Sequence, residues 1–409
     1  MEDYLPGPLL ELVNGISRHA GTLGHKVYLV GGVVRDLLLG YPSSDLDLVV
    51  EGDAVKLAQQ VMENGQARLL AHKRFGTAKL KYDGFTLDLA TARRETYTRP
   101  GALPAVTPGT LTDDLIRRDF SINAMAISLA ADNYGELIDL YQGRIDLEHR
   151  LIRVLHSRSF TDDATRILRG VRYEQRFGFE FEAHTADLLE RDIPMLDSIS
   201  GDRIRHELEL ILKEQLPELA IKRLGELGVL ARFRLSIKGD GWIAEKFGKA
   251  RRLKKPTQLP SLYFCLLVHS LDEMAIEQLL ARLNMPARLS RAMRDTVRLK
   301  TRLPLLDTPS LKPSQIYYLL TEYEPLAIQA SAIATESPTV RHSLQLFLTK
   351  LRYVRTALNG EELKRLGISP GPEMGRALRM LHKAKLDGEV RTKADEERLA
   401  VSSSRNLER

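Results

Sequence analysis

Two kinds of hydrophobic pattern divide the chain at about residue 150. Before that point, short apolar runs of strand length alternate with helical stretches. Residues 26–30 and 47–50 are rich in Val and Leu and predict strands, whereas residues 33–39 predict a helix. The first part of the chain is therefore expected to combine strands and helices.

A hairpin and a loop are predicted further along this part. Residues 78–82 and 86–90 alternate apolar and polar positions on either side of Asp83-Gly84, and an Asp-Gly pair is typical of a tight hairpin turn. Residues 93–112 contain several prolines and glycines, which interrupt regular structure. We predict a long loop there, and such loops are often functional.

Amphipathic helix patterns dominate after residue 150, and strand signals fade. Residues 256–260 are expected to form a linker, and the Ser-Pro-Gly-Pro run at 369–372 separates two helical stretches. The pattern predicts an α+β fold in which a mixed part precedes an all-helical one. The apolar stripes comprise Ile167, Leu168, Val171 and Phe177 in one helix and Ile204, Leu208, Ile211 and Leu212 in another.

Composition narrows the class of protein. The 409 residues are 43% hydrophobic and 28% charged, as in an ordinary globular protein, and no apolar run reaches the length of a membrane helix. The first residues show no signal peptide pattern. A single cysteine, Cys265, excludes an internal disulfide and a cysteine-based zinc site. We predict a protein of the reducing cytoplasm that needs neither a membrane nor an obligate protein partner.

The net charge of +6 is compatible with a nucleic-acid partner but is weak support for one. No phosphate loop of the GxxxxGK[ST] type occurs, so an ATPase of that class is not expected.

Candidate chemistry centres on a glycine turn followed by paired aspartates. Gly31 and Gly32 precede the predicted helix, where a bare backbone allows a phosphate to approach, and Arg35 follows one turn later. Asp45 and Asp47 are two apart at a strand entry and would project their carboxylates to the same face. Such a pair favours divalent cations such as Mg²⁺, and two of these ions can drive nucleotidyl transfer.

Each feature has a simpler interpretation when taken alone. A Gly-Gly pair is usually a turn, and an Asp-x-Asp pair is usually a solvated strand end. Their combination at this spacing favours the functional interpretation. Asp88, on the second strand of the predicted hairpin, is either a third carboxylate near the pair or a solvated strand residue.

Six blocks of the sequence resemble the class II tRNA nucleotidyltransferase and bacterial poly(A) polymerase family, which belongs to the DNA polymerase β-like superfamily. The resemblance is dense over residues 25–215 and thin between about 220 and 355. The blocks are LVGGVVRDLLLGYPSSDLDLVV (29–50), DDLIRRDFSINAMA (113–126), LIDLYQGRIDLEHRLIR (137–153), DDATRILRGVRYEQRFGF (162–179), RIRHELELIL (203–212) and LGISPGPEMGRAL (366–378).

This resemblance implies a role for each matching residue. Asp45 and Asp47 match the metal-binding pair of two-metal catalysis. Asp163 and Arg166 match the pair that reads the edge of the incoming base. The other matches contact the incoming nucleotide and comprise Gly32, Arg35, Arg118, Arg169 and Arg172; Gly31, the first residue of the glycine turn, is a further nucleotide-binding candidate.

The proposed base reading makes physical sense. Asp163 and Arg166 are three apart and are expected to share a helix face. A carboxylate acceptor beside a guanidinium donor suits cytosine or adenine and replaces a template. The alternative is that Asp162, Asp163 and Arg166 form a helix cap and an ion pair. Asp162 stands where the family commonly has Glu, which puts a direct role of residue 162 in doubt.

The resemblance also implies a domain order. A nucleotidyltransferase head at 1–150 would be followed by a neck at 151–215, an RNA-binding body at 216–330 and a tRNA-binding tail at 331–409. The implied substrates are ATP and CTP, and the implied partner is the 3′ acceptor end of tRNA.

Two basic clusters are candidates for holding RNA, although a charge stripe is usually a solvated helix face. One is the lysine- and arginine-rich run 246–255, and the other is a helical stripe with Asp295 as the one acid among its cations. The stripe comprises Arg291, Arg294, Arg298 and Arg302.

Three functions remain in competition. The first is addition of CMP and AMP, or of the terminal AMP alone, to tRNA; the presence of residues 93–112 argues against a strict CC-adding enzyme. The second is a poly(A) polymerase acting on general RNA ends. The third, a catalytically inactive RNA-binding protein, conflicts with the intact Asp45 and Asp47.

Overall fold

The computed structural model describes residues 5–41, 45–62, 68–72, 76–82, 84–233, 235, 241–253 and 258–407. Contacts between residues divide the chain into two compact units, Met1–Arg232 and Phe233–Arg409.

A seven-stranded mixed sheet forms the centre of the first unit. Its order is β3-β4-β5-β2-β1-β8-β9, with β2 and β5 parallel and the other neighbours antiparallel. Both predicted strands and the predicted hairpin are confirmed. The strands are β1 (Lys26–Val30), β2 (Asp45–Glu51), β3 (Arg68–His72), β4 (Thr77–Tyr82), β5 (Phe85–Thr91), β8 (Met125–Ser128) and β9 (Leu137–Asp139).

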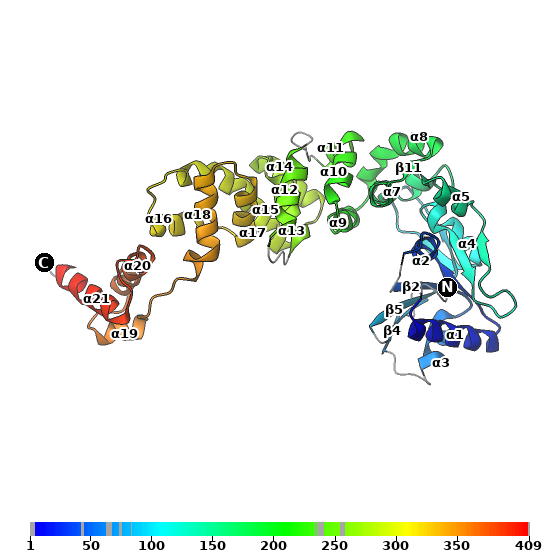
Figure 1. Ribbon diagram of the computed structural model, residues 1–409, viewed down its shortest axis with the longest axis horizontal. Helices are drawn as coiled ribbons and strands as arrows, with labels where there is room; N and C mark the ends of the chain where they lie inside the picture. Colours follow the sequence, from blue (N-terminus) through cyan, green and yellow to red (C-terminus); the bar gives the residue numbers. More distant parts are fainter. Residues whose placement is uncertain are drawn as a thin grey trace. The chain divides into compact units, whose positions relative to one another are not determined.

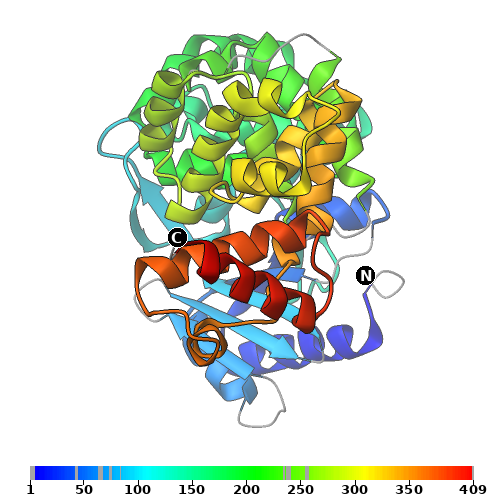
Figure 2. The ribbon, with the colours of Figure 1, turned by 90° about the vertical axis from the view of Figure 1, so that its left-hand side faces the viewer.

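Two helices cover one face of this sheet. Figures 1 and 2 both show α1 (Gly7–Thr22) running along that face, and α1 packs against α3 (Ala54–Met62) and β1. The helix predicted after the glycine pair is α2 (Gly32–Leu38). Leu9 and Leu57 are fully buried, so α1 and α3 supply much of the core on this side.

The prediction of a loop over residues 93–112 is wrong in part. β6 (Arg93–Thr96) and β7 (Ala105–Pro108) form a separate antiparallel pair. The prolines and glycines mark the connection and the end of β7 rather than the whole stretch. α4 (Leu111–Ile116) begins soon afterwards, capped by Thr110 and Asp113.

The rest of the first unit is helical apart from one short strand pair. β10 (Leu151–Ile152) and β11 (Glu180–Phe181) pair in parallel, which the expectation of an all-helical remainder missed because two-residue strands leave no alternation. The helices are α5 (Gly143–Glu148), α6 (Ser159–Asp162), α7 (Thr165–Phe177), α8 (Ala183–Asp192), α9 (Gly201–Ile211), α10 (Pro217–Glu226) and α11 (Val229–Arg232).

The predicted apolar stripes lie in α7 and α9. All their members are buried except Phe177, which is half-buried.

The described residues of the second unit form helices and no strand. The larger apolar cluster there includes Leu299, Leu320 and Leu344, and a second, around Leu363 and Leu381, lies between the last helices. The helices are α12 (Trp242–Arg251), α13 (Leu259–Val268), α14 (Glu273–Arg282), α15 (Ala287–Arg302), α16 (Pro313–Leu320), α17 (Pro325–Ala334), α18 (Pro338–Thr349), α19 (Gly360–Arg365), α20 (Pro372–Leu386) and α21 (Lys393–Leu407).

The prediction of a linker at 256–260 is wrong for its last two residues. Leu259 and Pro260 already belong to α13, because proline is tolerated in the first helical turn; residues 256 and 257 lie outside the described residues. Cys265 is fully buried in α13, as expected. The described helices include none with the length and apolar character needed to cross a membrane.

Candidate catalytic and nucleotide-binding site

The parallel pair β2–β5 brings the candidate catalytic aspartates to one face of the sheet. Its register aligns Asp47 with Asp88 and Asp45 with Thr86. Residues two apart on a strand share a face, and so do residues paired across neighbouring strands. The backbone of β2 therefore places Asp45 on the face of Asp47 and Asp88, although its own side chain lies outside the described residues.

A lysine that the sequence interpretation missed lies next to this row. Lys79 pairs with Asp88 across β4 and β5, and its Nζ is 3.1 Å from Asp88 Oδ2. The hairpin register predicted from the Asp-Gly turn would have identified this neighbour, because it puts residues 79 and 88 opposite each other.

The glycine turn lies against both Asp47 and Arg118. Gly31 has φ +79°, and a Cβ built there would lie 2.6 Å from Arg118 Nη1 and 4.0 Å from Asp47 Oδ2. Arg118 is anchored from behind by the fully buried Asp114, whose Oδ2 accepts from its Nη2 at 2.9 Å. Three predicted site residues thus meet at one point, with a guanidinium and a carboxylate facing a bare backbone.

Asp163 does not share a helix face with Arg166, so this part of the prediction is wrong. It lies in extended backbone just before α7, whose N-cap residue is Ala164, and its Oδ1 accepts from Thr165 N, the first residue of the helix, at 3.0 Å. The same oxygen lies 2.7 Å from Arg203 Nη2, and Oδ2 lies 2.9 Å from Arg169 Nη2. The alternative of a helix cap and an ion pair with Arg166 is therefore not met as stated, because Ala164 is the N-cap residue and the ion partners of Asp163 are Arg169 and Arg203.

Two partly exposed arginines, Arg169 and Arg203, control the charge of Asp163. Burial alone raises the pKa of this carboxyl, but the neighbouring Arg169, the hydrogen bond from Thr165 and the charge of Arg203 hold the pKa below its usual value. Asp163 is therefore a stable anion at neutral pH.

Arg166 connects α7 to the segment that carries Arg118. Its side chain is buried, and Nη2 donates to the carbonyl oxygen of Arg117 at 2.6 Å. Its Nε finds no hydrogen-bond partner among the described residues. An unpartnered buried donor is costly, which points to a ligand or a water that completes it.

Arg169 and Arg172 are both held by carboxylates of the protein. Arg169 Nη1 donates to Asp119 Oδ2 at 3.3 Å, and Arg172 Nη1 donates to Glu214 Oε1 at 3.4 Å. Glu207 on α9 lies between them, and burial raises the pKa of its carboxyl despite the two arginines. Their predicted phosphate contacts remain predictions.

Arg35 is enclosed on the protein side of the glycine turn. Its guanidinium donates to Asp36 and Asn123, and the residue as a whole is 4% exposed. The sequence interpretation missed Asn123 and Asp119. Both lie in the block 113–126, where Asn123 stands out as the polar residue of the otherwise apolar stretch 122–126.

Comparisons with known proteins agree with this geometry. A family model described as the poly A polymerase head domain matches residues 27–153, and one described as a probable RNA and SrmB-binding site of polymerase A matches residues 178–235. An A-adding tRNA nucleotidyltransferase of Halalkalibacterium halodurans is 35% identical over 97% of this chain and 92% of its own.

The chain belongs to the tRNA nucleotidyltransferase and poly(A) polymerase family.

Other relatives in this family differ in length, and their names state that they add different nucleotides. An A-adding enzyme of Geobacter sulfurreducens is 35% identical over 98% of this chain, which spans 48% of that relative's length. A CC-adding enzyme of Deinococcus radiodurans is 35% identical over 95% of this chain and 92% of its own. A solved CCA-adding enzyme in its apo form II is 30% identical, with a TM-score of 0.84 over 98% of this chain and 97% of that one.

The basic stripe expected to hold RNA lies on the outer side of α15. Arg291 and Arg294 are engaged with Glu324 and Glu277, whereas Arg298 and Arg302 are exposed and have no ion pair within the described part of the chain.

The cluster at 246–255 needs a correction. Lys246 is fully buried and ion-paired with Glu336, and its Nζ lies 5.8 Å from the centroid of the Trp242 ring. It is therefore not part of an open basic surface. Residues 254 and 255 lie outside the described residues.

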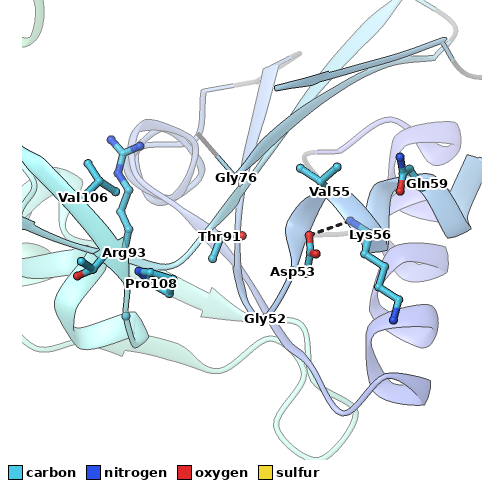
Figure 3. A pocket seen from close by; sticks show the side chains of 12 residues that line it. Gly52, Asp53, Val55, Lys56, Gln59, Gly76, Thr91, Arg93, Val106 and Pro108 are labelled. Carbon is cyan, nitrogen blue, oxygen red and sulfur yellow. Dashed lines mark hydrogen bonds between the residues drawn. The ribbon is translucent and has the colours of Figure 1, made fainter. Parts of the chain in front are cut away.

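A cavity of about 840 Å³ lies elsewhere in the first unit, at the far end of β2. Figure 3 shows its lining, with Lys56 of α3 and Asp53, the residue before that helix, on one side and Arg93 and Val106 on the other. Gly52, at its edge, is five residues beyond Asp47, which places the cavity roughly 16 Å along the strand from the carboxylates. The cavity is thus separate from the candidate site.

The predicted metal site depends on the geometry of strands β2 and β5. Among the side chains that the structure describes, no three acidic, histidine or cysteine groups converge on one point; Asp45 is outside that set. The donors Asp45, Asp47 and Asp88 share one face and offer hard oxygens, which fit Mg²⁺.

Proposed function

We propose that the chain transfers AMP from ATP to the 3′ end of tRNA, and that full CCA addition from CTP and ATP is the alternative. The observation that carries the proposal is the meeting of Asp47, Arg118 and Gly31 at one point, with Asp88 in register beside Asp47. The A-adding names of the Geobacter and Halalkalibacterium relatives support the choice of AMP.

The catalytic step is assigned to the sheet face. Asp45 and Asp47 would hold two Mg²⁺ ions, which supply activation of the 3′ hydroxyl and charge for the leaving pyrophosphate. Gly31 lets the triphosphate approach the backbone, and Arg118 would donate charge-assisted hydrogen bonds to it. Asp88 would complete the acidic face, with Lys79 neutralising its charge when no cation is present.

Base reading is assigned to Asp163 and Arg166. A carboxylate offers about four acceptor sites, and among the described residues Asp163 Oδ2 has one hydrogen bond, from Arg169. That oxygen retains a site for the exocyclic amine of adenine or cytosine. Arg166 keeps an unpartnered Nε among the described residues and would donate to a ring nitrogen. Arg169 and Arg172 remain candidates for phosphate.

RNA contacts are assigned to two surfaces of the second unit. Arg298 and Arg302 of α15 form the open part of the predicted stripe. Arg376, Arg379 and Lys383 of α20 add a second exposed row, because residues three and four apart share a helix face.

The head, neck, body and tail divisions at 1–150, 151–215, 216–330 and 331–409 remain proposals. So does a cytoplasmic location, which the single cysteine supports.

Transcripts with different 3′ ends test the proposed function. Purified protein is incubated with tRNA ending before the first C, after CC or after CCA, with Mg²⁺ and either ATP or CTP. We expect one AMP on the CC-ended transcript and none on the completed end. CMP incorporation would favour full CCA addition, and long adenylate tails on unrelated RNA would favour a poly(A) polymerase.

Substitution of a metal-binding candidate tests the mechanism. Asp45→Ala should abolish incorporation and leave tRNA binding nearly unchanged, because the carboxylate holds the cation rather than the RNA. Incorporation retained by this variant would contradict the two-metal mechanism.

A further inference from the structure

A basic strand lies beside the acidic strands of the central sheet. β4 is an inner strand between β3 and β5, and β5 lies next to β2 (Figure 1). Ala78 and Leu80 of β4 are buried, which fixes the inner face of this strand. Lys79 and Lys81 therefore project from its other face, where Lys81 is exposed. Lysines often protect the free edge of a sheet, but an inner strand has no free edge to protect.

Strand pairing places each of these lysines in line with a candidate catalytic carboxylate. Residues that pair across neighbouring strands share a face. Neighbouring strands are about 4.8 Å apart, so β4 lies roughly 10 Å from β2. The first row across β4, β5 and β2 is Lys79, Asp88 and Asp47, and the second is Lys81, Thr86 and Asp45.

The order of the strands indicates the side from which an RNA end would reach the carboxylates. β1 lies on the other side of β2 and leads into Gly31, where the triphosphate is proposed to bind with Arg118. In an in-line transfer the 3′ oxygen forms its bond to the α-phosphorus opposite the bond that breaks to release pyrophosphate, and the hydroxyl proton passes to water. With pyrophosphate on the side of β1, the RNA end lies on the side of β5 and β4.

The contact between Lys79 and Asp88 is one that a phosphate can replace. Lys79 Nζ lies 3.1 Å from Asp88 Oδ2, and the two side chains are 40% and 44% exposed. An exposed ion pair of this kind contributes little to stability, and the flexible stem of lysine lets its ammonium group turn to another anion.

Two further features of this face suit a single-stranded RNA end. Lys81 has no ion pair within the described part of the chain, so its charge is available without any exchange. Leu70 of β3 pairs with Lys79 and is 58% exposed. An apolar surface beside two cations fits a nucleotide, because its base has apolar faces and its phosphate is an anion.

We propose that Lys79 and Lys81 bind the phosphates of the last nucleotides of the RNA, and that Lys79 leaves Asp88 to do so. The exchange frees the Asp88 carboxylate to complete the acidic face when the RNA end is in place. The inference rests on the proposed function, because it takes the triphosphate to lie at the glycine turn and the acceptor to be an RNA end.

Equilibrium binding of tRNA without nucleotide tests the role of the two lysines. Affinity is measured for tRNA ending in CC and for the same tRNA without these two nucleotides, at several salt concentrations. We expect wild type to bind the CC-ended tRNA more tightly, and the double variant Lys79→Met/Lys81→Met to lose most of this preference. Each contact with a single-stranded phosphate contributes a slope of about −0.7 to log K against log salt, so the double variant should reduce the slope by up to about 1.4.

Lys26→Met/Lys56→Met is the matched control. Both of these lysines are exposed and belong to the first unit, so the control removes the same charge from the same part of the chain. Lys26 begins β1 at the end away from the glycine turn, and Lys56 lies on α3, which packs against β4 and β5. The preference for the CC end should therefore persist in this control.

Asp88→Asn tests the exchange. Without the carboxylate, Lys79 is released, so the CC-ended tRNA should bind several-fold more tightly. In the Lys79→Met background the same substitution should have a clearly smaller effect, because no lysine remains to be released. An equal gain in both backgrounds would show that loss of a negative charge alone is responsible, and would overturn the exchange.

Three results would overturn the assignment of RNA binding to the two lysines. They are a wild type that binds both tRNAs equally, a preference that persists in Lys79→Met/Lys81→Met with native circular dichroism, and an equal loss in the control. Only binding is measured, so these results are distinct from failure of the proposed function, in which the wild type adds no nucleotide to any transcript.

Discussion

Gly31 combines a special backbone with a crowded surrounding. Its φ of +79° is one that side-chain-bearing residues rarely adopt, and Arg118 Nη1 lies 2.6 Å from the place of a Cβ. Two features therefore require glycine at this position. The turn needs a positive φ, and the Arg118 guanidinium leaves no room for a Cβ.

Gly31→Ala should lower kcat/KM by tenfold or more, an effect of about 1.4 kcal/mol, because the methyl group displaces Arg118 from the turn. Gly40→Ala is the matched control. Gly40 has φ +76° but nothing within 4 Å of a Cβ, so it shares the positive φ without the steric contact. Equal activity losses in the two variants, measured by steady-state incorporation, would show that strain alone is responsible.

The ionisation of a single residue, Asp163, makes the stability of the folded protein depend on pH. Its pKa is held below the usual value by Arg169 and Thr165, so the folded protein gains stability from this group above about pH 4 and loses it as the pH falls through the folded-state pKa. Asp163→Asn should therefore cost about 3 kcal/mol at pH 7, the size expected when a buried pair loses one partner. The difference from wild type should shrink below pH 4 in denaturant titrations. A pH-independent difference would mean that shape, not charge, explains the cost.

At the scale of helices and strands, the sequence predicted those elements that a local residue pattern determines. Strands β1 and β2, the hairpin β4–β5 and the buried stripes of α7 and α9 follow from alternation, turn residues and helical spacing. The pair β6–β7 was missed because Pro100, Gly101 and Pro104 lie between the strands and mask their short alternation.

The site was predictable to the extent that its residues lie in a local motif. Asp45 and Asp47 follow from strand periodicity, and Gly31 from the turn. The contact of Arg118 with Gly31, and of Arg35 with Phe177, joins segments far apart in the sequence and depends on tertiary packing. Asp163 was placed on α7 because a spacing of three suggests a helix, whereas its backbone is extended.

The hairpin β6–β7 makes a testable contact with the site. Glu95 is buried and accepts from Tyr97 OH at 2.9 Å and from Arg117 Nη1 at 3.3 Å, and Arg117 also supplies the carbonyl that holds Arg166. Glu95→Gln should loosen Arg117 and lower the kcat for AMP addition several-fold, with an unchanged Kd for tRNA. Arg144→Gln, which breaks an exposed ion pair with Glu148, is the control. Equal rates in Glu95→Gln and wild type would refute the link.

At the scale of the whole chain, the basic side chains fall into two groups: some form ion pairs with acidic residues, and others are exposed without such a pair. Many cations of the second unit are neutralised locally: Lys312, Lys393 and Arg398 pair with Glu389, Glu362 and Asp395. In contrast, Arg376, Arg379 and Lys383 form an exposed row on α20 with no ion pair in the described part of the chain. An open row of this kind suits phosphates, because its cations need not leave a carboxylate to bind RNA.

The salt dependence of tRNA binding distinguishes a role of the exposed α20 row from a role of the ion-paired cations. Each phosphate contact contributes a slope of about −0.9 to a plot of log K against log salt for a duplex, so neutralising Arg376, Arg379 and Lys383 together should reduce the slope by up to about 3. Affinity for tRNA should fall, while kcat at saturating tRNA stays unchanged, because the candidate catalytic carboxylates lie in the first unit. Neutralising Lys312, Lys393 and Arg398 removes the same charge and serves as the control. If both triple variants changed the slope equally, net charge rather than the α20 row would govern RNA binding.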